Sequence, residues 1–174
     1  STFQVRPRHT YTLTESSVAG YQFQKLQQLV NGSWVDVVAS ADPNGYPRQN
    51  GQGNWMVQVA GLDTPVYRFV NDDVAPKLTL VKEVVNNNGG TAANTAWTLE
   101  ANTPGGPSLS GVTGTPAVSN QNVKAGVVYT LSESVIAGYD WTTLSCTGYA
   151  NTTKDSPTLT LKPGDNVTCT FTND

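Results

Sequence analysis

A lysine, a glutamate and an asparagine, which are Lys82, Glu133 and Asn173, could together form a covalent bond within this chain. Each is the last residue of a segment in which apolar residues occupy every second position. Tyr129, Leu131 and Glu133 alternate with small polar residues, and in a β-strand that spacing places them on one face. A carboxylate on a buried face is costly unless it is paired or neutralised, so Glu133 predicts a partner inside the domain.

The lysine and the asparagine end their runs in the same manner. Leu78, Leu80 and Lys82 share one face of a predicted strand, and Phe171 and Asn173 share one face of the last predicted strand, with Val167 and Cys169 in phase. Three strands of one domain therefore end their inward-facing columns with an amine, a carboxyl and a carboxamide. These are the groups needed for one reaction.

The chemistry would be formation of an isopeptide bond. Burial lowers the pKa of a lysine and raises that of a glutamate, and a neutral lysine amine is a nucleophile. A protonated Glu133 could polarise the Asn173 carboxamide and relay protons while Lys82 attacks and ammonia leaves. The product is stable, so this would be a single-turnover reaction of the chain with itself and not an enzyme activity. On these residues alone, a buried Lys–Glu ion pair with a hydrogen-bonded asparagine is the alternative.

The motif that carries Glu133 occurs twice, and this sets the expected domain count. Residues 11–21 (YTLTESSVAGY) repeat residues 129–139 (YTLSESVIAGY) at a distance of 118 residues, and residues 69–72 (FVND) repeat residues 171–174 (FTND) at a distance of 102. We therefore expect two copies of one module: 1–73, a short proline-containing linker at 74–76, and 77–174.

The first module has about 16 extra residues between its two motifs, and we assign them to a long loop over about 30–54 that surrounds a strand at 34–39. Trp34, Tyr46 and Trp55 make this segment a candidate ligand loop, because exposed aromatic residues on loops often bind ligands. The alternative is a solvated surface excursion. The alternation that follows Trp55 favours a place in the core for that residue.

Composition favours an all-β fold and excludes several classes of partner. Hydrophobic residues make up 37% of the chain and charged residues 13%, glycine and proline are frequent, and leucine-rich helical periodicity is missing. The net charge is −3 and there is no long basic run, so a nucleic acid is not an expected partner. No apolar run reaches transmembrane length, so we expect no membrane insertion of this segment.

The two cysteines, Cys146 and Cys169, have no nearby histidine and no Cys-x-x-Cys spacing. A disulfide between strands is therefore favoured over a metal site, and it would place the protein in an oxidising, extracellular setting. We expect no metal and no cofactor. The chain has a single histidine, His9, and no Gly-x-Ser-x-Gly motif in which a serine nucleophile could act with it, so hydrolysis is not expected.

The ordered motifs of residues 77–174 resemble the CnaB-type, prealbumin-like (SpaA-type) domains of bacterial surface adhesins and pilins. The resemblance rests on Leu-x-Leu-x-Lys, then Tyr-x-Leu-x-Glu with a following Gly-Tyr, then Phe-x-Asn. It implies an immunoglobulin-like, transthyretin-like β-sandwich with an isopeptide bond between Lys82 and Asn173 and with Glu133 as proton relay. The segments around Cys146 and Cys169 look like a branch of these domains that carries its own disulfide.

The first module departs from this pattern. It keeps Glu15 and Asn71, but the strand that should carry the lysine is missing. Lys25 follows the Gly-Tyr, in the wrong strand, and we interpret it as a surface lysine. The chain begins abruptly at Ser1, so the missing strand either lay upstream or comes from another chain. Three interpretations stay open: an acceptor for a strand in trans, a truncated remnant, and a domain of altered topology.

The resemblance implies a structural role. We expect a secreted protein of the bacterial cell surface or cell wall, in which these modules form the stalk or tip of an adhesin and adjoin further domains of the same large protein. The alternative is a tip module that binds a glycan or protein through the first-module loop. The sequence does not identify the receptor.

Overall fold

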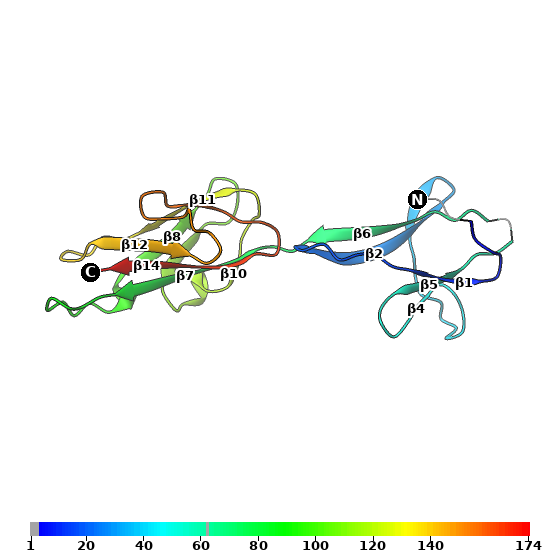
Figure 1. Ribbon diagram of the computed structural model, residues 1–174, viewed down its shortest axis with the longest axis horizontal. Helices are drawn as coiled ribbons and strands as arrows, with labels where there is room; N and C mark the ends of the chain where they lie inside the picture. The colour runs from blue at the N-terminus through cyan, green and yellow to red at the C-terminus, as the bar shows by residue number, and fades with distance from the viewer. Residues whose placement is uncertain (1–3, 62) are drawn as a thin grey trace. The chain divides into compact units, whose positions relative to one another are not determined.

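Strands account for nearly all the regular structure of the chain, which confirms the predicted all-β class (Figure 1). The computed structural model describes residues 4–61 and 63–174; the predicted start of the first module at Ser1 lies outside the described residues. The chain divides into two compact units, Ser1–Asp72 and Asp73–Asp174, here called unit 1 and unit 2.

The strands of unit 1 are β1 (Thr10–Leu13), β2 (Tyr21–Val30), β3 (Ser33–Asp36), β4 (Arg48–Gln49), β5 (Trp55–Gln58) and β6 (Tyr67–Asp73). β6 ends one residue beyond the boundary between the units. The elements of unit 2 are β7 (Lys77–Val84), η1 (Asn94–Ala96), β8 (Thr98–Asn102), β9 (Leu109–Val112), η2 (Pro116–Val118), β10 (Gln121–Asn122), β11 (Val128–Glu133), β12 (Trp141–Cys146), β13 (Thr158–Thr160) and β14 (Asn166–Asn173). Among the described residues no helix is long and apolar enough to cross a membrane.

Unit 2 is a sandwich of two four-stranded sheets. One sheet has the order β10-β7-β14-β12 and the other the order β13-β11-β8-β9. Figure 1 shows the first and last strands of the unit, β7 and β14, side by side, and they pair in parallel over their whole length. Buried residues from both sheets form one continuous hydrophobic core, which is the arrangement of a β-sandwich.

The core of unit 2 follows from the alternation in the sequence. Along β14 every second residue is buried, from Val167 to Asn173, and along β7 the same holds from Leu78 to Lys82. The period of two sends these residues to the face that packs against the opposite sheet. The predicted inward columns therefore lie inside the sandwich, and their polar last members lie there too.

Unit 1 consists of two three-stranded sheets, with the orders β1-β5-β4 and β3-β2-β6. Among its described residues the buried hydrophobic side chains are Leu26, Trp55, Val57 and Val59. Large apolar side chains at the start of β2, such as Tyr21 and Phe23, are 50% and 44% exposed. Unit 1 thus has much less core than unit 2.

The predicted long loop over residues 30–54 contains more strand than expected. β2 and β3 form a hairpin through Asn31 and Gly32, both of which have positive φ, as a tight hairpin turn requires. The strand expected at 34–39 begins and ends earlier, at Ser33–Asp36, and β4 lies inside the segment that was expected to be loop. Lys25, expected at the surface, forms an exposed ion pair with Asp36 at 3.0 Å.

Candidate functional site

The candidate site of unit 2 is a buried contact between Lys82 of β7, Glu133 of β11 and Asn173 of β14. The Lys82 Nζ donates a hydrogen bond to Glu133 Oε2 at 2.6 Å and another, very short one to Asn173 Oδ1. Lys82 and Asn173 are 1% and 2% exposed, and the side chain of Glu133 is 4% exposed. The sequence-predicted site residues of this unit are therefore brought together out of solvent.

Strand register explains the contact. In the parallel pair of β7 and β14, Lys82 lies opposite Phe171 and Val84 lies opposite Asn173. Residues two apart on a strand share a face, so Lys82 and Asn173 are diagonal neighbours on the inner face. Glu133 ends β11 in the opposite sheet and reaches the same point across the core.

Trp97, which precedes β8, lines the site, although it was not among the predicted site residues. The Lys82 Nζ lies 4.7 Å from the centre of the indole ring, and Tyr139 packs edge-on against that ring at 5.3 Å. Trp97 is fully buried, and its Nε1 has no hydrogen-bond partner. The sequence pattern could have indicated that Trp97 faces inward, because Trp97, Leu99 and Ala101 alternate with other residues and all three are buried.

Burial lowers the pKa of the Lys82 amine from its ordinary value, and the hydrogen bond and negative charge of Glu133 oppose part of that change. A lowered pKa increases the fraction of neutral amine at a given pH. The arrangement thus presents a nucleophilic nitrogen, a carboxyl group that can exchange protons with it, and a carboxamide in direct contact.

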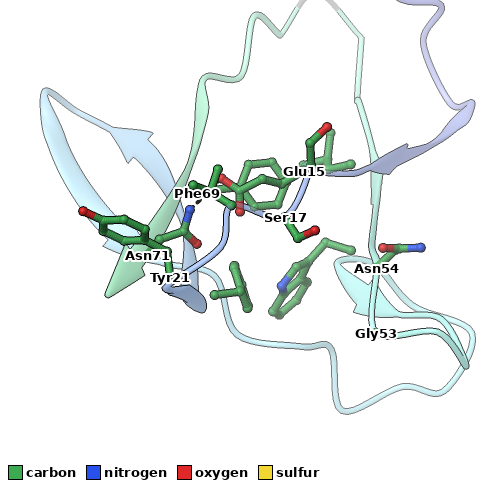
Figure 2. Close-up of a pocket in the computed structure, with 12 residues that line it drawn as sticks. Glu15, Ser17, Tyr21, Gly53, Asn54, Phe69 and Asn71 are labelled. Carbon is green, nitrogen blue, oxygen red and sulfur yellow. Dashed lines mark hydrogen bonds between the residues drawn. The ribbon is translucent and has the colours of Figure 1, made fainter. Parts of the chain in front are cut away.

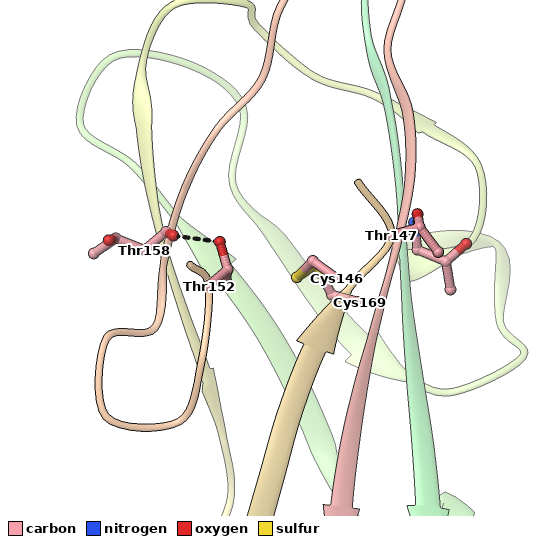
Figure 3. The surroundings of a disulfide bond; sticks show 6 residues. Cys146, Thr147, Thr152, Thr158 and Cys169 are labelled. Atoms are coloured by element: carbon pink, nitrogen blue, oxygen red, sulfur yellow. Dashed lines mark hydrogen bonds between the residues drawn. A yellow bond between two sulfur atoms is a disulfide. The ribbon is translucent and has the colours of Figure 1, made fainter. Parts of the chain in front are cut away.

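The predicted disulfide between Cys146 and Cys169 is confirmed. The two residues lie directly opposite each other on β12 and β14, and Figure 3 shows them together beside Thr147. Close by, the Thr152 hydroxyl donates to the Thr158 carbonyl at 2.8 Å. β14 is therefore tied covalently to β12 near its middle, while its end carries Asn173.

The corresponding pair of unit 1 also meets, but at the surface. The Asn71 Nδ2 donates to Glu15 Oε1 at 2.8 Å, and both residues are exposed. They line an open pocket of about 220 Å³ together with apolar side chains, among them Trp55 and Phe69. In Figure 2, Asn71 and Tyr21 lie at one side of this pocket, and Asn54 and Gly53 lie at the other.

The three aromatic residues of the candidate ligand loop lie in three different settings. Trp34 is 36% exposed, but the Arg68 guanidinium covers its ring at 4.2 Å. Tyr46 is half-buried and accepts a hydrogen bond from the Thr10 hydroxyl at 2.9 Å. Trp55 is 8% exposed, in agreement with its alternation. Of the three residues, only Trp34 is exposed, and its ring is covered on one face by Arg68.

Comparison with known families gives one match. The family model described as a prealbumin-like fold domain, of the SpaA type, matches residues 73–171, which is more than half of the chain. The chain belongs to this family. The prealbumin-like domain includes Lys82 and Glu133, the match ends two residues before Asn173, and membership suggests a structural module of a surface protein. The comparisons with curated proteins and with solved structures give no significant match.

No group of histidine, cysteine, aspartate and glutamate side chains suited to a metal ion occurs in the described part of the prealbumin-like domain or of unit 1.

Removing one charge of the buried pair should destabilise unit 2 more than removing both. Lys82→Met leaves Glu133 buried without its cation, an arrangement that costs about 3–5 kcal/mol. Lys82→Met combined with Glu133→Gln also removes the buried negative charge, so we expect the double variant to have the higher free energy of unfolding. Both variants lack the amine, so both report on a chain without a crosslink. Amide hydrogen exchange of β7 and β14 measures unit 2 separately, and a double variant less stable than the single one would contradict the ion-pair account.

Proposed function

We propose that unit 2 is a structural module of a bacterial cell-surface protein, stabilised by an isopeptide bond that forms spontaneously between Lys82 and Asn173. The observation that carries the proposal is the buried contact of the Lys82 amine with both the Glu133 carboxylate and the Asn173 carboxamide. The reaction is intramolecular and occurs once per chain, so the protein is not an enzyme in the usual sense.

The roles of the three residues follow from their chemistry. The neutral Lys82 Nζ attacks the Asn173 Cγ, and Glu133 takes the proton released by the amine. Glu133 then returns a proton to the Asn173 Nδ2, which leaves as ammonia, and the Nζ–Cγ amide bond remains. Trp97 contributes by excluding water from the site and by holding the amine between its ring and the carboxylate.

The position of the bond supports a mechanical role. Lys82 and Asn173 are 91 residues apart in sequence but lie on adjacent parallel strands, the first and last of the unit. A force applied to the two ends of unit 2 would run along β7 to Lys82 and across the bond to Asn173. The intervening residues, with most of both sheets, would carry no load.

This role fits an extracellular setting, in which the Cys146–Cys169 disulfide is stable. The proposed partners are neighbouring domains of the same surface protein. A glycan- or protein-binding tip that uses the first-module loop is the weaker candidate, because Trp34, Tyr46 and Trp55 are covered, hydrogen-bonded or buried.

The intact mass of the reduced protein tests the bond. We expect a mass lower than the sequence mass by one ammonia molecule. Lys82→Ala and Asn173→Ala should each restore the full mass expected for that variant, and Glu133→Gln should slow the loss about 100-fold or more, as removal of an acid–base group does. Lys77→Ala, in the same strand, is the control and should still lose ammonia. A wild-type chain with the full sequence mass would rule the bond out.

Single-molecule stretching tests the mechanical role. With the bond in place, unit 2 should add almost no length when it is pulled from its two ends under reducing conditions. In Lys82→Ala the 91-residue span should extend by roughly 300 Å, at about 3.3–3.6 Å per residue. An equal extension in both proteins would show that the bond, even if formed, does not shield the domain.

A further inference from the structure

The Gly-Tyr pair of the repeated motif lies in the connection between β11, which ends at Glu133, and β12, and the reaction proposed for unit 2 does not use it. The Tyr139 amide donates to the Ile136 carbonyl at 3.2 Å in a turn in which Gly138 has a φ of 85°. The Tyr139 side chain is half-buried, and its ring packs edge-on against that of Trp97, with the ring centres 5.3 Å apart. The turn therefore brings Tyr139 to the residue that lines the site.

The hydroxyl group of Tyr139 belongs to a closed ring of three hydrogen bonds. It donates a short hydrogen bond to Asn86 Oδ1 and accepts one from the Ala92 amide at 2.9 Å. The Asn86 Nδ2 donates to the Ala92 carbonyl at 3.1 Å and so closes the ring. A Cβ atom at Gly90 would overlap the Tyr139 hydroxyl, so the loop can pass this close only with a glycine at that position.

This ring ties down the loop that leads from Lys82 to Trp97. Asn86 follows the end of β7, and Ala92 lies shortly before η1, which Trp97 follows directly. A loop that is tied near both ends has fewer conformations, so the Tyr139 hydroxyl restricts where Trp97 can lie. The Trp97 ring in turn lies 4.7 Å from the Lys82 amine.

The same segment also holds the end of β14. Asp140 and Asp174 exchange two backbone hydrogen bonds, from the Asp140 amide at 2.9 Å and from the Asp174 amide at 3.1 Å. The Val85 amide, just after β7, donates to the Asn173 carbonyl at 2.8 Å. Tyr139 and its neighbour thus join the ends of the two strands that carry the reacting side chains.

We propose that Tyr139 is a positioning residue for the reaction of Lys82 with Asn173. Its hydroxyl group fastens the loop over residues 86–92, and its ring holds Trp97 against the Lys82 amine. The inference rests on the bond proposed above for unit 2, and it assigns to Tyr139 an action through Trp97 and the loop and not on the reacting atoms. Such an action matters because the rate of a reaction between two held groups falls steeply when one of them is displaced.

Unit 1 indicates that the turn does not need the hydroxyl contacts. Tyr21 occupies the position that corresponds to Tyr139, its amide donates to the Val18 carbonyl at 3.1 Å, and Gly20 has a φ of 81°. The same turn therefore forms in unit 1, although Tyr21 is 50% exposed. We expect Tyr139→Phe to keep the turn and the edge-on contact with Trp97 and to lose only the ring of hydrogen bonds.

The rate of ammonia loss tests the proposal. The full chain is made by cell-free synthesis, and its intact mass is followed over time. Tyr139→Phe should reach the same final mass as the wild type, at a rate that is lower by as much as ~100-fold. Asn86→Ala breaks the same ring and should slow the reaction equally, and the two changes together should slow it no further. Tyr149→Phe is the matched control, because it removes a tyrosine hydroxyl that donates to Asp165 outside the site, and it should react at the wild-type rate.

A second measurement does not depend on the bond. In a chain with Asn173→Ala, which cannot form the crosslink, the pKa of Lys82 is measured by NMR titration of ¹³C-labelled lysine side chains. Burial lowers the pKa of Lys82, so a loosened Trp97 that admits water should raise this pKa toward its ordinary value when Tyr139→Phe is added. A change in the stability of the domain alone would not produce that shift.

The outcomes separate this inference from the bond itself. A slower reaction together with a raised pKa of Lys82 would support the role of Tyr139. Ammonia loss at the wild-type rate in Tyr139→Phe would overturn it while leaving the bond in place, and a slower reaction with an unchanged pKa would overturn the route through Trp97. A wild-type chain that never loses ammonia would refute the bond and, with it, the reaction that Tyr139 is proposed to assist.

Discussion

The buried contact between the Lys82 amine and the Glu133 carboxylate is the interaction on which the rest of unit 2 depends. Two charges removed from water are costly, and the geometry is tolerable because each has a partner at hydrogen-bond distance. The contact requires the opposite sheet to place β11 over β7. The parallel pairing of β7 with β14 then brings the Asn173 carboxamide to the same point.

The two units differ in the extent of their cores. Unit 2 has the lysine strand, a continuous core and a buried triad. Unit 1 has the same two motifs, and its β1 pairs with β5 at the positions at which β11 pairs with β13 in unit 2, yet its glutamate and asparagine are exposed, and Tyr21 and Phe23 are 50% and 44% exposed. In unit 2, β7 carries Lys82 and also contributes the buried Leu78 and Leu80, so one strand supplies the reactive amine and part of the hydrophobic core.

The sequence predicted the parts of the fold that rest on strict alternation. The inner faces of β7, β11 and β14, and with them the meeting of three polar residues, follow from a period of two. The bounds of β12 and β2 were not predicted, although Cys146 and Lys25 were each expected to lie on a strand. In β12 a register shift between Trp141 and Thr143 interrupts the alternation, and the first half of β2 is exposed on both faces. Trp97 was not predicted at the site, since its contact with Lys82 depends on how the sheets face each other.

The central claim is that the contact between β7 and β14 is converted into a covalent bond. Digestion of the reduced wild-type protein followed by tandem mass spectrometry tests it directly. The account predicts a branched peptide in which a fragment containing Lys82 is joined through its side chain to a fragment containing Asn173. Recovery of both fragments as separate, unmodified peptides would contradict it.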